Sequence, residues 1–142
     1  MKTQKKIHVL ALIVLLASLL AGCGSKTTTL TGADQDAVLA FSEAKTDNLL
    51  AGMNASDYAM FSADFDKDML SAMTQSQFDA LKLDKDAKLG LYVSRQVNSV
   101  VLDGDFYAVI YDAKFEKDAA VVVRVVFRVA EPHQVSGLWF NK

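Results

Sequence analysis

The chain has 142 residues, 51% of them hydrophobic and 23% charged, with a formal net charge of −2 at pH 7. This length allows one domain with its own hydrophobic core. A slightly acidic chain without a basic stripe disfavours nucleic-acid binding, because phosphates are neutralised by lysine and arginine. The only cysteine, Cys23, excludes a disulfide within the chain, so the fold must rely on its core.

Residues 1–22 have the pattern of a signal peptide. Three lysines (Lys2, Lys5 and Lys6) precede an apolar run over residues 7–20, which ends on the small residues Ala21 and Gly22. The apolar run is shorter than the roughly 20 residues that span a bilayer as a permanent helix. The pattern therefore predicts export and removal of this segment rather than a membrane-spanning anchor.

The four residues Leu20, Ala21, Gly22 and Cys23 resemble the bacterial and archaeal lipobox. The resemblance implies that the Cys23 thiol receives a diacylglyceryl group and that cleavage occurs just before it. Two acyl chains hold a protein stably on a membrane, whereas one holds it only marginally. The protein is then expected on the extracytoplasmic side of the cell membrane or outer membrane. An uncleaved helix and an ordinary secretory cut are the alternatives.

Cleavage after residue 22 would remove three lysines and no acids, which changes the formal charge from −2 to −5. Residues 23–33 then comprise the lipidated cysteine and a Gly/Ser/Thr-rich segment, "GSKTTTLTGA", which predicts a flexible tether. Residues 34–142 are predicted to form a single domain.

The first half of this domain has helical spacing. Apolar residues recur at helical intervals over residues 34–52, and Gly52 is expected to end that helix. A second helix is expected after Asn54 or Ser56, because Tyr58, Phe61, Phe65 and Met69 follow at steps of three and four. Thr74 or Ser76 can start a third helix, which ends in "KLDKDAK" at residues 82–88.

The second half is rich in β-branched and aromatic residues. Four strands are expected within residues 89–102, 105–115, 119–130 and 134–140, with Asp103 and Gly104 as a strong hairpin signal. Short loops between consecutive strands predict an antiparallel meander. Helices on one face of this sheet define the α+β class.

Alternation in the third strand predicts which face is buried. One row is apolar throughout (Val121, Val123, Val125, Phe127, Val129), and the alternate row carries two arginines (Val122, Arg124, Val126, Arg128, Ala130). If Phe115 lies opposite Ala119, the second strand adds Tyr107, Val109, Tyr111, Ala113 and Phe115 to the buried side and places Asp112 and Lys114 outside. A shift of this pairing by one residue would exchange the buried and exposed sides of the second strand.

The segments "DYAMFSADFDKDM" (57–69), "FDAL" with "LGLYVS" (78–94), "YAVIYDAKFE" (107–116) and "VSGLWF" (135–140) resemble the uncharacterised lipoprotein family known as domain of unknown function 3887. The resemblance covers nearly all of residues 36–140. It implies a nuclear transport factor 2-like (cystatin-like) fold, a cone of helices over a curved four-stranded sheet. Its motifs look structural, so they indicate a fold rather than an activity.

The sequence offers few residues for metal binding or nucleophilic catalysis. Asp64, Asp66 and Asp68 resemble the start of a calcium loop, but Met69 stands where glycine is needed and Gln75 where the bidentate glutamate belongs. Beyond residue 22 the only histidine is His133, so a Ser-His-acid set would have to recruit it, and the usual zinc ligands are lacking. We expect no cofactor and no metal.

Two classes of function remain open. The expected wall of the cone is Tyr58, Tyr107, Tyr111, Phe127 and Trp139, which suits either an apolar small ligand or a filled core. The outer row with Arg124 and Arg128 can bind a protein partner or a second copy of the chain. The first hypothesis is therefore a non-enzymatic, lipid-anchored binding protein of the cell envelope.

The alternative is an enzyme. The implied fold is similar to that of ketosteroid isomerases and scytalone dehydratases, which work inside the cone. A small isomerase- or dehydratase-like enzyme requires a carboxylate desolvated in the cone pocket. Asp112, the one acid within a strand, is expected to point outward toward Arg124 or Lys114.

Overall fold

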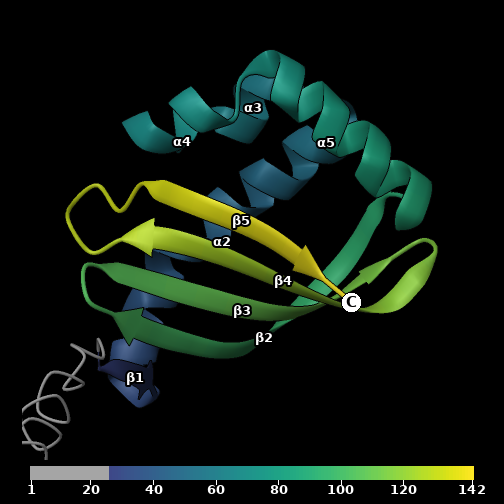
Figure 1. Cartoon of the computed structure of the whole chain (residues 1–142). Helices are drawn as coiled ribbons and strands as arrows, with labels where there is room; N and C mark the ends of the chain where they lie inside the picture. Colours follow the sequence, from purple (N-terminus) through teal and green to yellow (C-terminus); the bar gives the residue numbers. More distant parts are fainter. Residues whose placement is uncertain (1–25) are drawn as a thin grey trace, which may run out of the picture.

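The computed structural model describes residues 26–142, which form an α+β fold of helices followed by an antiparallel sheet (Figure 1). In chain order the elements are β1 (Thr27–Leu30), α2 (Gly32–Ala55), α3 (Tyr58–Ser62), α4 (Lys67–Ala72), α5 (Gln75–Lys88), β2 (Tyr92–Asp103), β3 (Phe106–Phe115), β4 (Asp118–Arg128) and β5 (Val135–Asn141). The predicted α+β class is confirmed. The predicted signal peptide and the lipobox residues Leu20 to Cys23 lie outside the described residues.

The first helix is longer than predicted, because Gly52 does not end it. α2 continues to Ala55, and Ser56 closes it in a left-handed conformation (φ 58°). Gly52 instead allows α3 to cross closely, since a Cβ at this position would lie 2.4 Å from the backbone nitrogen of Phe61. Its lack of a side chain is needed for packing rather than for termination.

The predicted second helix is divided in two. Asp57 caps α3 by accepting a hydrogen bond from the Met60 amide (3.0 Å), and Asp66 caps α4 by accepting one from the Met69 amide (2.8 Å). The interruption around Phe65 is held by β5, because the Asp66 N–H donates to the Val135 carbonyl (2.9 Å). The third helix starts as predicted, with Thr74 as its cap.

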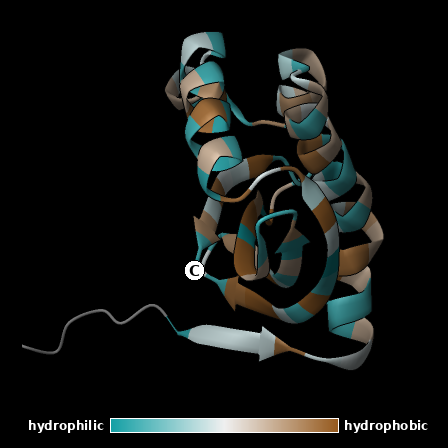
Figure 2. Ribbon diagram, turned by 90° about the vertical axis from the view of Figure 1, so that its right-hand side faces the viewer, coloured by the Kyte–Doolittle hydropathy of each residue, from teal (hydrophilic) through white to brown (hydrophobic). Residues whose placement is uncertain are grey.

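The sheet has five strands in the order β1-β2-β3-β4-β5, not the four that were predicted. The additional strand is β1, which pairs antiparallel with the end of β2 from Thr27 opposite Asp103 to Leu30 opposite Val100. It is the pale arrow at the bottom of Figure 2. Four residues of the expected tether are therefore part of the sheet.

The second and third strands expected from the sequence are β3 and β4, and the pairing predicted between them is confirmed. Tyr111 lies opposite Val123 and Ala113 opposite Val121, which excludes the one-residue slip. A bulge near the turn shifts only Phe115, which pairs with Asp118 instead of Ala119. Val129 lies just beyond β4.

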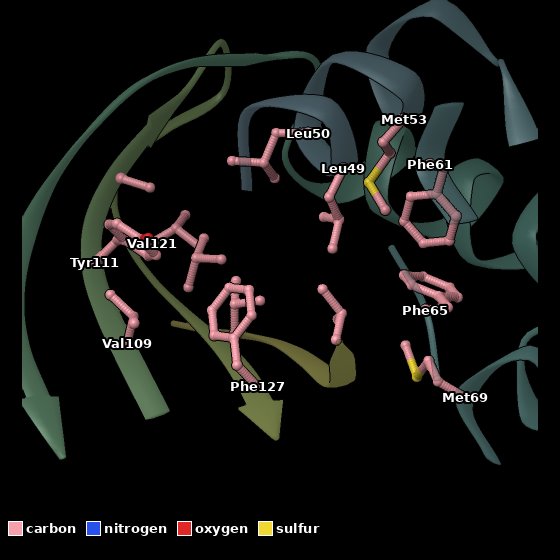
Figure 3. Close-up of a cluster of buried hydrophobic side chains, with 14 of the residues drawn as sticks. Leu49, Leu50, Met53, Phe61, Phe65, Met69, Val109, Tyr111, Val121 and Phe127 are labelled. Atoms are coloured by element: carbon pink, nitrogen blue, oxygen red, sulfur yellow. The ribbon is translucent and has the colours of Figure 1, made fainter. Parts of the chain in front are cut away.

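The core lies between the inner face of the sheet and the helices. Figure 3 shows Leu49, Leu50 and Met53 of α2 and Phe61 of α3 facing Val109, Tyr111 and Phe127 of the sheet. Burying each such side chain contributes roughly 1.5–3 kcal/mol. We refer to the face that packs on the helices as the inner face and to the opposite face as the outer face.

Candidate functional site

Four of the five residues expected to line one pocket lie in the core or pack against it, and the fifth, Trp139, does not. Tyr111 and Phe127 are fully buried in the core. The Tyr58 hydroxyl donates to the Met73 carbonyl (2.7 Å), and its ring packs on Phe78. Tyr107 is partly buried and packs against the core near Phe41 (ring centroids 6.0 Å apart). Trp139 lies on the outer face, so the five residues do not form one wall, whereas the buried Tyr111 and Phe127 fit the filled core that the sequence left open as one alternative.

Trp139 reaches the outer face because β5 contains a bulge. Phe127 pairs with Val135, but the next residue of β4, Val126, pairs with Gly137, which leaves Ser136 as an extra residue. The extra residue reverses the alternation of side chains. Val135 therefore faces the core, whereas Gly137 and Trp139 share the outer face with Arg124.

The Trp139 side chain is 46% exposed and is held over the backbone of β5. A Cβ on Gly137 would lie 2.3 Å from the indole, so glycine is what allows the ring to lie there. Arg124 of β4 lies opposite Trp139, and its guanidinium lies over the indole, 5.2 Å from the ring centroid. Among the described residues Arg124 forms no ion pair, which leaves a cation beside an exposed aromatic ring.

A groove of about 320 Å³ runs beside this pair. Its apolar side chains are Phe106, Ala108, Val126 and Trp139, and its polar ones are Asp66, Asp68, Asp103, Arg124, Arg128 and Ser136. Val126 and Ala108 are buried although they belong to the outer face. The outer face thus combines an apolar floor with charged edges, as protein-binding surfaces do. We call this site the outer groove.

One end of the outer groove is fixed by Asp66, whose carboxylate is buried. It accepts hydrogen bonds from the Met69 amide, from Arg128 Nε (2.6 Å) and from the Ser136 hydroxyl. Burial raises the pKa of Asp66, but Ser136, the Met69 amide and Arg128 outweigh it and hold the pKa below its ordinary value. A carboxylate kept ionised in this way is a poor proton shuttle.

A second polar cluster lies between α2 and the inner face. Tyr111 donates to Glu43 (2.7 Å), and Arg95 binds Glu43 (3.1 Å) and Asp47 (2.6 Å). Burial raises the pKa of Tyr111 above its ordinary value, and Glu43 adds to that effect. Burial lowers the pKa of Arg95, but Asp47, Tyr92 and Glu43 raise it overall. The tyrosine thus stays neutral and the arginine charged, which suits a structural link.

The aspartates considered for calcium are engaged elsewhere. Asp66 and Asp68 pair with Arg128, and Asp64 lies 3.5 Å from the Lys45 ammonium. Within residues 26–142 no group of three or more His, Cys, Asp or Glu side chains has the arrangement of a metal site. Asp112 is exposed as predicted, but it accepts a hydrogen bond from Asn98 (3.0 Å) rather than from Arg124 or Lys114.

His133 lies in the turn between β4 and β5. Its ring stacks on Phe41 (centroids 4.0 Å apart), and Nδ1 lies 3.1 Å from the Arg128 carbonyl. Lys45 of α2 donates to the carbonyls of Pro132 (2.6 Å) and His133 (3.2 Å). These contacts attach the turn firmly to α2.

Sequence reasoning identified Arg124 and Arg128 on the outer face but missed Asp66, Ser136 and Gly137 as parts of the site. An aspartate three residues before Met69 is a helix-cap signal that could have marked Asp66. No local signal marks the bulge at Ser136. Within the described residues no helix is long and apolar enough to cross a membrane.

No family model, curated protein or solved structure matches this chain. The fold and the outer groove therefore have to be interpreted from their own geometry.

Proposed function

We propose that this chain is a lipid-anchored protein of the cell envelope whose domain binds a protein partner through the outer groove. The single observation that carries the binding role is the exposed Trp139, held over Gly137 beside the unpaired Arg124. Tryptophan and arginine are the residues that most often dominate binding energy at protein interfaces. The lipobox-like sequence ending at Cys23 supports the anchor.

The order of elements is consistent with a nuclear transport factor 2-like (cystatin-like) fold and with membership of the lipoprotein family of domain of unknown function 3887. In this proposal the family's cone is filled by the core residues around Tyr111 and Phe127. The buried Tyr111 and Phe127 give less support to a small apolar ligand at the centre of the cone than the exposed Trp139 gives to a partner on the outer face.

An isomerase- or dehydratase-like reaction in the cone finds less support. Such a reaction requires a carboxyl group with a raised pKa in an apolar pocket. Asp66, the buried carboxylate of the described residues, has a lowered pKa and faces the outer groove, not the cone. The carboxylate of Glu43 is occupied by Tyr111 and Arg95.

The anchor is tested by Cys23→Ser in cells that are fed labelled palmitate. We expect the precursor to stay unprocessed and unlabelled, because serine offers no thiol for the diacylglyceryl group. The matched control is Ser25→Ala, which leaves the lipobox intact and should be processed and labelled normally. Normal processing and membrane retention of Cys23→Ser would refute the anchor.

The first partner to test is a second copy of this chain, since a homodimer through the outer face needs no other component. Light scattering on the domain should give the mass of a dimer, and Val122→Asp or Arg124→Glu should reduce it to a monomer. Leu83→Asp, on an exposed position of α5, is the control and should leave the mass unchanged. A monomeric parent would rule out self-association and leave a different protein as the partner.

A further inference from the structure

The position of β1 determines how far the domain can stand from the anchor. Only residues 24–26 separate Cys23 from Thr27, the first residue of the sheet. An extended chain advances at most about 3.6 Å per residue, so the four steps from Cys23 to Thr27 span at most about 14 Å. The stem is therefore much shorter than the tether that the sequence predicted.

The end of the domain nearest to this stem can be identified from the strand pairing. Thr27 lies opposite Asp103, at the turn between β2 and β3. Figure 1 shows this turn on the same side of the fold as the turn between β4 and β5. The Val129 N–H donates to the Asp105 carbonyl (2.9 Å), which joins the two turns. We call residues 103–106 and 129–134, together with Thr27, the anchor end.

The anchor end is linked to the helices as well as to the sheet. Its second turn is bound to α2 through Lys45 and through the stacking of His133 on Phe41. The opposite end is the turn between β3 and β4, and the ten residues of β3 place it about 33 Å away.

We infer that the lipid-anchored domain stands on the membrane surface on its anchor end, with the strands directed away from the bilayer and the outer groove facing sideways. This inference rests on the proposed lipidation of Cys23. The groove would then be accessible to partners held in the same membrane.

The charge of the anchor end indicates how it meets the lipid. Its acids are Asp103, Asp105 and Glu131, and its cations are Lys26 beside Thr27 and Lys45, whose ammonium lies 2.6 Å from the Pro132 carbonyl. Anionic headgroups attract basic segments, not acidic ones. Because the acids outnumber the lysines at this end, we expect the covalent anchor to hold the domain and the anchor end to rest at the headgroups without entering them.

The experiment uses the chain from Cys23 onward, because residues 26–142 contain the complete described core. Cys23 is coupled chemically to a maleimide phospholipid in vesicles whose headgroups carry a nitroxide quencher. Two single-tryptophan variants are made in a Trp139→Phe background: Asp105→Trp at the anchor end and Ala119→Trp at the opposite end. The parent, with Trp139 alone, reports the outer face.

We expect quenching at position 105 to be several-fold stronger than at position 119, and Trp139 to be quenched only weakly. Equal quenching at 105 and 119 would overturn the inference, and so would strong quenching of Trp139, which would mean that the outer face lies on the bilayer. Inserting ten Gly and Ser residues after Lys26 should abolish the difference between 105 and 119. If the difference persists with the long stem, the stem does not orient the domain.

The chemical coupling separates this inference from the proposed function. Failure of palmitate labelling in cells would refute the natural anchor while the vesicle result still reported the geometry. Loss of the quenching difference would refute the orientation while leaving lipidation intact.

Discussion

Arg128 of β4 reaches across the outer groove to Asp66 at the start of α4, and its Nε lies 2.6 Å from the carboxylate. Asp66 is only 2% exposed and the Arg128 side chain is 36% exposed, so the pair joins the helical half of the chain to the sheet at the boundary between core and solvent. Because the same carboxylate caps α4 and accepts from Ser136, three contacts depend on it.

Asp66→Ala should lower the free energy of unfolding by about 2 kcal/mol, because it removes the cap of α4 and the buried acceptor of the Ser136 hydroxyl and of Arg128. Urea denaturation at pH 7 measures this. The matched control is Asp68→Ala, whose side chain is 84% exposed although it also contacts Arg128. The control should lose less than about 1 kcal/mol, and equal losses in the two variants would contradict the role of Asp66.

Asp66 should also make stability depend on acid pH. Its folded-state pKa is lowered, so its contribution is complete above the unfolded-state value of about 3.9 and is lost as the pH falls through the folded-state pKa. Between pH 5 and pH 2 the free energy of unfolding, measured by urea denaturation at each pH, should therefore fall more steeply for the parent than for Asp66→Asn. Some slope should remain in the variant, because Lys82 and Lys85 outweigh burial and lower the pKa of Asp86 as well. Parallel curves for parent and variant would show that Asp66 does not contribute.

Removing each of two buried hydroxyls on α2 should have different effects on the free energy of unfolding. Ser42 is fully buried, and its oxygen has no hydrogen-bond partner among residues 26–142, whereas the Thr46 hydroxyl lies 3.2 Å from that of Tyr111. Ser42→Ala should leave the free energy of unfolding unchanged or raise it by up to about 1 kcal/mol, and Thr46→Val should lower it by about 1 kcal/mol. A comparable loss in both variants would indicate that Ser42 has a partner.

Gly137→Ala should displace the indole of Trp139, since the new Cβ would overlap the ring. Trp139 is the only tryptophan, so its emission reports the change directly and should shift to longer wavelength as the ring enters solvent. Gly104→Ala serves as the control: Gly104 has φ +57° and open space around it. Gly104→Ala should lower the free energy of unfolding by about 1–2 kcal/mol because of backbone strain, and the Trp139 emission should stay unchanged.

The sequence predicted the core of the sheet correctly because one strand, around Val123 and Val125, is apolar on every inward position. The boundaries of the helices and strands were less predictable. The run Thr27–Leu30 resembled a linker because it is polar, and only its pairing with Val100 to Asp103 makes it a strand. Gly52 resembled a helix end, although it is a crossing point for α3.

The candidate site was harder to predict than the core for a related reason. Strict alternation from the buried Val135 would place Trp139 inside, and the single extra residue at Ser136 places it outside. A bulge depends on contacts with another strand and with Asp66, and neither is encoded in the local pattern of β5. Of the five aromatic residues expected in one wall, only Trp139 is moved away by this bulge, because the other four lie in the core or pack against it.

Asn54 forms an unusual contact with the sheet. Its amide donates to the Tyr92 carbonyl and accepts from the Tyr92 N–H, both at 2.9 Å, as a neighbouring strand would. Among the described residues β1 pairs only with Val100 to Asp103, so the beginning of β2 is otherwise an open edge. Open edges promote intermolecular strand pairing and aggregation. The Asn54 side chain at this edge therefore opposes strand pairing between molecules. This effect matters most where many copies are crowded together on one surface.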